Sequence, residues 1–504
     1  MYSTLTRLWL SSGIFLLILL TSAPGNAQQV LQTNRYELPL EKNDFYDVMP
    51  SQEDGIFLYR RLFAEDDDKI EIIKLDTAFQ VNWKGYLSVD KRMSLMAKRA
   101  VNGQFFLLFR RLDLKRNNMQ LFAVSQANGN YVTFEVKNYI PFAPTEFQIT
   151  EKAALIGGYF NQVPVVMYYS FATMRSKILP GLLNESGELT QIKTYPDGTF
   201  DVLISAINFK KQQTVWIKNY DEEGDLQSNF ALEPEESKHL IFARAMKTND
   251  NVQLIAGVYG GRNSDYSRGL FLASVGESGL QQLRYYNYGD LENFFKYMRA
   301  KREQRVKERI ERRKIKGKRI RFSYRFLVHE IVPYKNQYVL LGEAFYPRYK
   351  SIEPSYGFFS SGPQYYGVRN GRIFDGYSYT HAVVMGFDQN GKLLWDNSFE
   401  INDVRTFTLE QFVKLEVQED RIALLYLFEN ELRSKIIHND EVLEGKTFEP
   451  IRTKTDEIIK KEETELSKLD YWYQDFFYAY GIQEITNPGT GKKRVFFINK
   501  ISCQ

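Results

Sequence analysis

Short apolar runs alternate with polar turns along most of this chain. The clearest example lies between Thr380 and Trp395, where two apolar runs flank the turn Asp388-Gln389-Asn390-Gly391. Asn-Gly is typical of a tight hairpin, because both positions accept positive φ at little cost. The segment therefore predicts two antiparallel strands joined by a tight turn over 388–391.

From residue 44 onward this strand–turn–strand pattern belongs to a four-part unit. A first strand, a polar turn and a more apolar second strand are followed by a third and a fourth strand. The unit recurs about every fifty residues, within the range of repeat proteins. The second strands are expected at 56–59, 105–112, 154–159, 202–204, 254–261, 338–342 and 422–426. The turns between third and fourth strands are expected at 76–78, 126–129, 184–187, 221–224, 277–279 and 388–391.

These units predict an all-β fold, a β-propeller of seven or eight four-stranded antiparallel blades. Each sheet is apolar on both faces and needs neighbours on both sides to bury them. The last unit lacks an outer strand. We expect a helical segment at 456–469 and strands at 476–485 and 494–501, with residues 30–40 supplying the missing strand and closing the ring. The alternative is two smaller β-domains, such as stacked sandwiches.

Glycines near the ends of second strands, at Gly157-Gly158, Gly260-Gly261 and Gly342, resemble those of kelch-type blades. The Asp-x-x-Gly turn followed by a strand, as at 388–395, is similar to repeats of bacterial quinoprotein-type and other secreted propellers. The resemblance covers nearly the whole repeat region and implies a fold only. Such propellers include binding modules, assembly modules and enzymes, so the resemblance does not choose a function.

The N-terminus carries the features of a secretory signal peptide over Met1–Ala27. Arg7 precedes an apolar run from Leu8 to Leu20, and small residues at 23–27 suit cleavage after Ala27. We expect residues 28–504 to form a single propeller domain, secreted or periplasmic; an uncleaved anchor is the alternative. Cys503 is the one cysteine, so no internal disulfide is expected.

Sequence motifs for catalysis are absent. The four histidines lie in different repeats without metal-ligand spacing, and packed histidines are the favoured interpretation, although His329 with Glu330 could approach His381. No Gly-x-Ser-x-Gly or Walker-type motif occurs, and Cys503 is too close to the terminus to be held by a rigid scaffold. We expect no catalytic residue, metal or cofactor; a quinone is disfavoured by the lack of the tryptophan pattern. Paired carboxylates in a central pocket remain open.

The first departure from the repeat is a basic insertion at 291–317. It predicts a helix with an apolar stripe at Phe295, Met298, Val306 and Ile310 and with i,i+4 pairs Glu303–Lys307 and Glu308–Arg312. Its excess of cations favours contact with anionic lipid, polysaccharide or an acidic protein, and a solvated helix is the alternative. The candidate partner-binding residues here are Arg299, Arg302, Arg305, Arg309, Arg312 and Arg313.

The second departure is an aromatic insertion at 345–379, rich in Tyr and Phe among Gly, Ser and Pro. Tyrosine on such loops gives binding surfaces contact area at low entropic cost, and aromatics folded back onto the propeller are the alternative. The candidate partner-binding residues are Tyr349, Tyr356, Phe358, Phe359, Tyr365 and Tyr366. Since both insertions belong to one sector of the ring, we expect them to form one surface.

The leading hypothesis is a non-catalytic secreted or periplasmic binding or scaffold protein. We expect its partner to be a protein or an anionic envelope component, lipid or polysaccharide, which includes peripheral contact with a membrane. The expected location outside the cytoplasm excludes nucleic acid. We expect a monomer or a member of a hetero-complex. The alternatives are a glycan-active hydrolase or lyase with carboxylates in the central pocket, and a structural protein attached to the cell surface.

Overall fold

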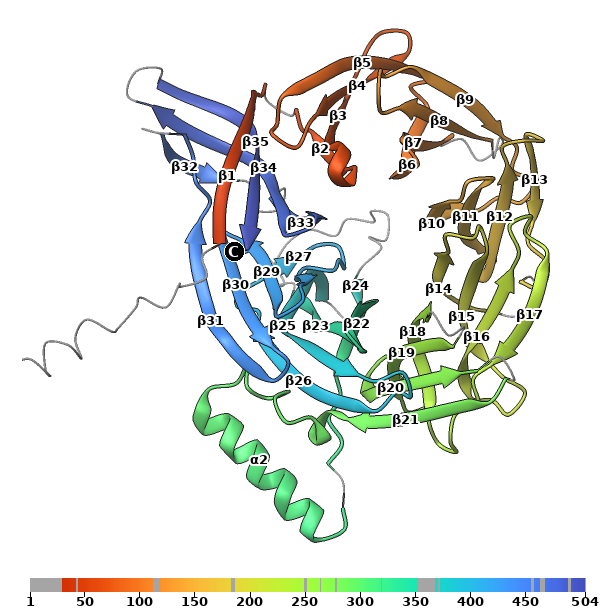
Figure 1. The fold of residues 1–504 in the computed structure, drawn as a ribbon, viewed down its shortest axis with the longest axis vertical. Coiled ribbons are helices and arrows are strands. Elements are labelled where there is room, and N and C mark those ends of the chain that lie inside the picture. Colours follow the sequence, from red (N-terminus) through yellow and green to blue (C-terminus); the bar gives the residue numbers. More distant parts are fainter. Residues whose placement is uncertain are drawn as a thin grey trace, which may run out of the picture.

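The computed structural model describes residues 30–503 except 42–43, 112–117, 183–185, 249–251, 263, 277–278, 319, 352–367, 370–371, 455–456, 463–466 and 488–490. Within these residues the strands form eight antiparallel sheets arranged around a common axis, the blades of a β-propeller (Figure 1). The predicted fold class is confirmed, and the blade number is eight. The signal-peptide prediction falls on residues outside the described part.

Blades one to four each contain four consecutive strands, the first nearest the axis. Their strands are β2 (Asp47–Pro50), β3 (Ile56–Leu62), β4 (Asp68–Leu75) and β5 (Val81–Val89); β6 (Met93–Val101), β7 (Gln104–Arg111), β8 (Met119–Ser125) and β9 (Tyr131–Val136); β10 (Ala143–Ile149), β11 (Ala153–Phe160), β12 (Val163–Ser170) and β13 (Arg175–Ile178); and β14 (Gly187–Thr194), β15 (Phe200–Ile207), β16 (Gln213–Tyr220) and β17 (Leu226–Ala231).

Blades five to seven follow the same order, with short additions in blade six. Their strands are β18 (His239–Lys247), β19 (Gln253–Gly260), β20 (Ser267–Val275) and β21 (Gln281–Asn287); β22 (Arg325–Tyr334), β23 (Gln337–Ser351), β25 (Arg372–Phe387) and β26 (Leu393–Glu400), with β24 (Val368–Arg369) and β27 (Arg405–Thr406) paired to β25; and β28 (Lys414–Val417), β29 (Ile422–Phe428), β30 (Glu431–His438) and β31 (Glu441–Pro450).

The eighth blade joins the two ends of the chain. From the axis outward it consists of β33 (Lys468–Tyr473), β34 (Phe476–Asn487), β35 (Gly491–Cys503) and β1 (Val30–Pro39), and β32 (Ile458–Glu462) pairs with the far part of β34. Strand β1 runs antiparallel to β35, from Val30 opposite Cys503 to Pro39 opposite Val495. The predicted closure by the N-terminal strand is confirmed.

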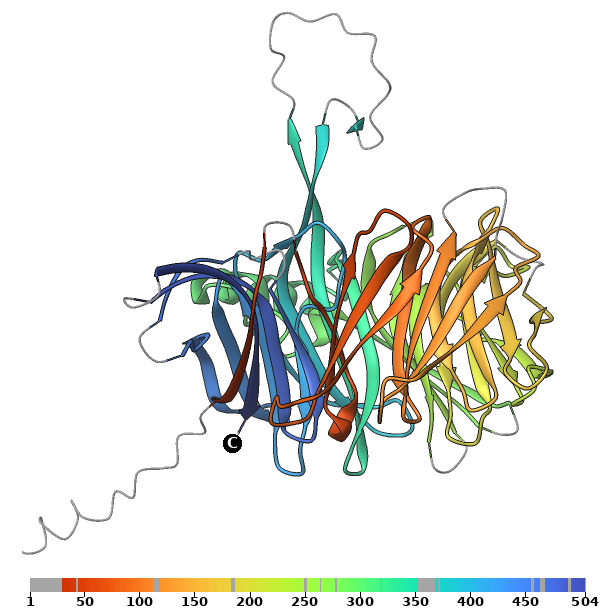
Figure 2. The ribbon, with the colours of Figure 1, turned by 90° about the horizontal axis from the view of Figure 1, so that it is seen from above.

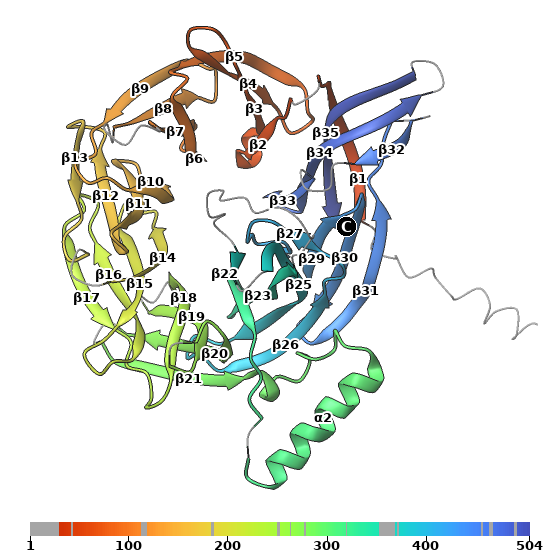
Figure 3. The same cartoon turned by 180° about the vertical axis from the view of Figure 1, so that it is seen from behind.

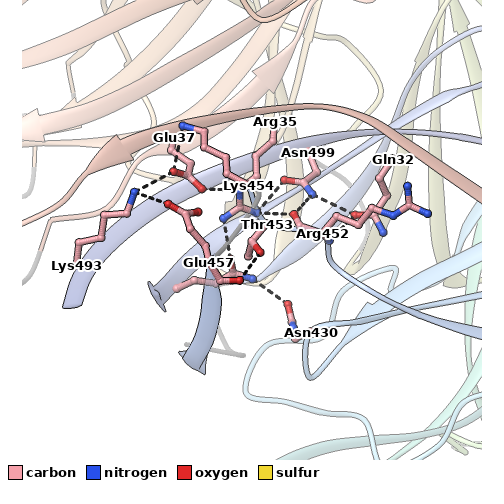
Figure 4. Close-up of polar contacts among 11 residues, drawn as sticks. Gln32, Arg35, Glu37, Asn430, Arg452, Thr453, Lys454, Glu457, Lys493 and Asn499 are labelled. Carbon is pink, nitrogen blue, oxygen red and sulfur yellow. Dashed lines mark hydrogen bonds and ion pairs between the residues drawn. The ribbon is translucent and has the colours of Figure 1, made fainter. Parts of the chain in front are cut away.

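A polar cluster fixes this closure at Arg35 of β1 (Figure 4). The Arg35 guanidinium donates to Glu37 Oε1 at 2.6 Å and to Asn499 Oδ1 at 3.0 Å. It also donates to the carbonyl oxygen of Arg452, 3.1 Å away, in the segment that follows blade seven. Lys493 Nζ lies 3.5 Å from the second oxygen of Glu37, Oε2. The cluster therefore ties the first strand both to the last blade and to its neighbour.

Two details of the predicted strand pattern are wrong. The segment 456–469 is not helical in its described part: β32 and β33 are strands, because the exposed edges of β34 supply backbone partners that override the local helix preference of charged residues. The turn expected at 184–187 within blade three lies instead between blades three and four, and the turn of blade three is at 171–174.

The Asp-x-x-Gly turns are held by the aspartate side chain. Asp388 Oδ1 accepts hydrogen bonds from the backbone N–H groups of Asn390 and Lys392, at 2.9 and 2.8 Å. Asp221 makes the same two bonds in blade four. The turn lies at 388–391 as predicted, with Gly391 at a positive φ of 72° and Asn390 not at positive φ. These carboxylates therefore serve turn formation.

The core consists of apolar layers between neighbouring blades. Phe57 of blade one stacks on Phe105 of blade two with ring centroids 4.5 Å apart. Glycine is required where strands approach closely: a Cβ on Gly257 would lie 2.0 Å from the Phe242 carbonyl oxygen, and one on Gly342 would lie 2.1 Å from the Phe326 ring. Gly342 is one of the glycines that prompted the kelch-type resemblance, and another, Gly158, would place a Cβ 2.4 Å from the Ala143 carbonyl oxygen, so both have a packing role.

Candidate functional site

The basic insertion forms helix α2 (Ala300–Ile315), which lies along the outer rim of the disc beside blades five and six (Figures 1 and 3). Its lead-in is packed into the core, with Leu291, Phe294 and Phe295 buried. The η2 turn (Tyr288–Asp290) precedes it. Because this lead-in is buried, the helix is a fixed part of the propeller rim. Among the described residues, no helix is both long and apolar enough to cross a membrane.

His381 on β25 anchors the lead-in. Its ring is fully buried, stacks on Tyr297 and meets the edge of Phe294, with ring centroids 4.7 Å apart for the second contact. Thr380 Oγ1 lies 2.9 Å from Nδ1, while Nε2 has no hydrogen-bond partner among the described residues. Burial lowers the pKa of His381 to about 3, so the imidazole is neutral at physiological pH.

The predicted apolar stripe holds α2 against the propeller. Ile310 is buried, and Val306 and Met298 pack on the same core cluster as Phe295. The predicted Glu303–Lys307 ion pair is present at 2.8 Å. The predicted Glu308–Arg312 ion pair is not formed: Arg312 Nε instead donates to the Glu308 carbonyl oxygen.

One exposed side of α2 is cationic. Successive α-helical residues are rotated by about 100°, so residues three, four, seven and eight apart share one side. Six exposed cations lie together on this side, next to the apolar stripe that packs on the propeller, and no described acid forms an ion pair with any of them. We call this set the cationic face: Lys301, Arg302, Arg305, Arg309, Arg312 and Arg313. Arg299, the sixth predicted arginine, is exposed at the helix N-cap.

The aromatic insertion begins and ends as a two-stranded ribbon. Strands β23 and β25 continue past the disc, with Pro347 opposite Tyr377 and Tyr349 opposite Phe374 (Figure 2). Tyr349 is 48% exposed and touches Phe374 edge-on. The other predicted aromatic residues, Tyr356, Phe358, Phe359, Tyr365 and Tyr366, lie outside the described residues. The insertion is therefore not a simple loop at its base.

The expectation that the two insertions form one surface is wrong for their described parts. Figure 2 shows the ribbon rising from one flat face of the disc, whereas α2 stays at the level of its rim. The reason is topological: α2 connects an outermost strand, β21, to the next blade, while the ribbon extends the two middle strands of blade six. The two elements present different sides of the molecule.

The structure separates the histidines that sequence placed together. His329 Nε2 lies 2.6 Å from Glu343 Oε1, which also accepts from the backbone N–H of Val413. His381 lies instead under the α2 lead-in. No group of three or more His, Cys, Asp or Glu that could hold a metal occurs in the described part of the chain.

Cys503 lies within strand β35 and is buried, contrary to the expectation that it is too close to the terminus to be held by the scaffold. Burial raises the pKa of its thiol, which disfavours the reactive thiolate.

Near the axis, a group of charges surrounds Asp47 of β2. Lys98 Nζ and Tyr59 Oη donate to Asp47 Oδ2 at 2.6 and 2.5 Å, and Tyr480 Oη donates to Oδ1 at 3.2 Å. Burial favours protonation of Asp47, but the Lys98 ammonium and these donors outweigh it, and its pKa is lowered. Burial also lowers the pKa of Lys98, against the attraction of Asp47.

A second axial group gathers around Glu330 of β22. Gln191 Nε2 donates to its carboxylate at 2.8 Å, Lys193 lies at 3.0 Å, and Arg244 at 3.6 Å. Glu146 of β10 lies in the field of the same groups, and burial raises its pKa despite the nearby arginines. Glu330 is thus a paired carboxylate, while Glu146 is shifted toward its protonated form.

Sequence reasoning missed both axial groups. Apart from Tyr59 and Tyr480, which lie on second strands, their members come from the first strands of six blades, up to hundreds of residues apart, and no local motif joins them. One signal was present: first strands carry charges at positions where a fully buried strand would be apolar, as at Lys98, Glu146 and Glu330. Stacking the repeats around one axis would have brought these positions together.

Comparisons with known proteins show likeness only among solved structures; no protein-family model and no curated protein matches the chain. The propeller domain of the Trilobed protease from Pyrococcus furiosus is 12% identical with a TM-score of 0.37, over 80% of this chain and 98% of that one. A prolyl endopeptidase is 10% identical with a TM-score of 0.37, over 82% and 50%. Synechocystis apocarotenoid oxygenase is 7% identical with a TM-score of 0.30, over 53% and 67%. At these scores the eight-bladed fold rests on the strand pairing itself.

Proposed function

We propose that this protein is a non-catalytic binding protein that docks on anionic lipid headgroups through the cationic face of α2. One observation carries the proposal: six exposed cations share one side of a helix that Val306 and Ile310 fix to the propeller. A charged helix that only kept the protein soluble would mix both signs on its exposed side. Here cations outnumber acids: Glu303 and Glu311 approach lysines, Lys307 and Lys314, and Glu308 alone lies at the edge of the cationic face, beside Arg312.

The geometry suits a flat anionic surface. From Lys301 to Arg313 the helix rises by about 18 Å, so the six cations can contact several headgroups at once. Each cation near an anionic leaflet contributes about 1 kcal/mol, and the attraction falls off within a Debye length. Since Val306 and Ile310 pack on the propeller, the apolar stripe of the helix is not free to insert. The proposal is therefore electrostatic, reversible docking at the surface.

The aromatic ribbon is proposed as a separate contact for a protein partner. Tyr346 and Tyr349 are 46% and 48% exposed on the described part of the ribbon. Exposed tyrosines on a projecting ribbon supply contact area to a partner at low entropic cost. In this view Tyr356, Phe358, Phe359, Tyr365 and Tyr366 extend the same contact. Replacing residues 352–367 by a short Gly/Ser turn should remove protein capture from cell envelopes and leave lipid docking unchanged.

Vesicle co-sedimentation tests the lipid proposal. The full chain without its first 27 residues is mixed with vesicles of phosphatidylcholine alone or with about one-third phosphatidylglycerol, at low and high NaCl. The expected result is binding to the anionic vesicles at low salt, lost at high salt, with no binding to phosphatidylcholine. Equal binding to neutral and anionic vesicles would contradict the proposal. Binding to soluble anionic polysaccharide in preference to vesicles would also contradict it.

A glycan-active hydrolase is the second candidate, and Glu146 favours it. Glycoside hydrolysis uses a pair of carboxyl groups, one of them an acid with a raised pKa. Burial raises the pKa of Glu146, and Glu330, the second carboxyl group, lies 3.0 Å from Lys193. Hydrolysis of a polysaccharide panel that is lost in Glu146→Gln and in Glu330→Gln would establish this activity. Wild-type inactivity on the panel, with lipid docking intact, would favour the binding protein.

A further inference from the structure

A polar recess of the propeller lies near the axis, where the first blade meets the last two. It is a cavity of about 420 Å³, which we call the axial pocket. This volume falls within the range typical of small-molecule sites. Its walls come from β2, β6, β28, β33 and β34 and from the segment before β28. The charged and tyrosine side chains that line it are Asp47, Lys98, Glu410, Lys414, Lys468, Asp470, Tyr478 and Tyr480.

The charges of the axial pocket balance in three pairs. Lys98 Nζ lies 2.6 Å from Asp47, Lys414 Nζ lies 3.2 Å from Asp470, and Lys468 Nζ lies 3.3 Å from Glu410. The Asp47 and Asp470 side chains remain 37% and 50% exposed. The pocket therefore offers several accessible acceptors and donors around a space with no net formal charge.

We propose that the axial pocket binds an uncharged polyhydroxylated ligand, a neutral saccharide of one or two rings. A hydroxyl group both donates and accepts, so it can bridge a carboxylate and an ammonium without separating them. An anionic or cationic ligand would leave one member of a pair uncompensated in a partly enclosed site, which costs more than it gains. Phe412, Tyr478 and Tyr480 contribute to the apolar part of the wall.

This site is independent of lipid docking by α2, and it binds without cleaving. Glycoside cleavage requires a protonated acid, whereas Asp47 has a lowered pKa and Glu410 and Asp470 each face a lysine. Its ligand would contact blade one through Asp47 and blade eight through Asp470. Because those blades meet at the ring closure, the bound saccharide should also stabilise the closed ring.

Isothermal titration calorimetry with a panel of neutral sugars tests the proposal, with galacturonate and glucosamine as charged comparators. The panel is glucose, galactose, maltose, lactose and cellobiose at millimolar concentrations. We expect at least one neutral sugar to bind and to raise Tm, and the matching charged sugars to bind about tenfold more weakly. No heat from any neutral sugar, or tighter binding of a charged one, would overturn the proposal.

Two variants place the binding in the pocket. Asp470→Asn and Glu410→Gln each remove one acceptor at the accessible edge of the pocket and should weaken sugar binding by about tenfold. Glu419→Gln, in the exposed turn between β28 and β29, removes the same charge outside the pocket and should leave binding unchanged. Equal binding by all three variants would show that the sugar binds elsewhere. Retention of sugar binding when the cationic face is neutralised separates this site from the lipid proposal.

Discussion

The rings of Tyr297 and His381 stack with centroids 3.8 Å apart and planes inclined by 6°. Tyr297 precedes α2 by three residues, and His381 lies on β25 in the middle of blade six. The contact joins the basic insertion to a strand of the propeller that is more than eighty residues away. It fixes the direction in which α2 leaves the rim, and so the direction of its cationic face.

Acid should weaken this anchor. The pKa of His381 is about 3 in the folded protein, against 6.5 for an ordinary histidine. The unfolded chain therefore binds the proton more readily, and stability falls as pH drops below 6.5 toward 3. At pH 5 this single group should cost about 2 kcal/mol relative to pH 7. Urea unfolding at the two pH values measures the loss.

His381→Phe is the matched variant, because phenylalanine keeps the aromatic stack and cannot be protonated. Other titrating groups contribute equally to both proteins, so the loss of stability between pH 7 and pH 5 should be about 2 kcal/mol smaller in the variant. The same loss in both proteins would show that His381 does not govern this acid sensitivity.

Ring closure predicts a specific cross-link. Val30 and Cys503 face each other across β1 and β35, and Cα atoms of paired antiparallel residues lie close enough for a disulfide. Val30→Cys should therefore form a bond to Cys503 on oxidation and raise the free energy of unfolding by about 4 kcal/mol. Mass spectrometry and urea unfolding, with and without reductant, check both. Leu38→Cys, which faces Phe496, is the control and should stay reduced.

Breaking the closure cluster should be costly. Arg35→Met removes the donor to Glu37, whose side chain is only 4% exposed, and leaves that carboxylate with the more distant Lys454 and Lys493. We expect a loss of about 3 kcal/mol in the free energy of unfolding. Arg92→Met, which breaks the exposed pair with Asp90, should cost less than about 1 kcal/mol. Similar costs for both variants would contradict the role given to Arg35.

The close approach at Gly257 predicts a steric effect. A Cβ there would meet the Phe242 carbonyl oxygen at 2.0 Å, and backbone cannot move aside as a side chain can. Gly257→Ala should lower the free energy of unfolding by about 2 kcal/mol. A Cβ on Gly276 meets nothing within 4 Å, so Gly276→Ala should be close to neutral. Thermal unfolding of the two variants provides the comparison.

Local patterns were enough to predict the propeller. The aspartate turns, the apolar second strands and the unpaired segment 30–40 together indicated repeated sheets and an N-terminal strand that closes them. The basic helix was equally visible, since Val306 and Ile310 recur at helical spacing among good helix formers. These features are set by neighbours in the chain.

Features set by distant neighbours were not predictable. Segment 456–469 carries a helix-like charge pattern, but the exposed edges of β34 draw it into strands. The groups around Asp47 and Glu330 form only when six or more blades share an axis. The separation of α2 from the ribbon depends on which strand of a blade each insertion extends. In each case the deciding contact lies far away in sequence.

Comparison of two charge-matched variants tests the central claim most directly. One carries Arg302, Arg305, Arg309, Arg312 and Arg313 changed to Gln, which suits a helix almost as well as Arg. The other carries the same loss of charge on exposed cations around the ring: Lys69, Lys137, Arg175, Lys210 and Lys392 changed to Gln.

Both variants are measured by co-sedimentation with phosphatidylglycerol-containing vesicles at low salt. If the cationic face of α2 docks the protein on anionic lipid, the first variant should lose at least about tenfold in affinity and the second should bind nearly as well as wild type. Equal loss in the two variants would mean that overall charge, and not the face of α2, carries the binding.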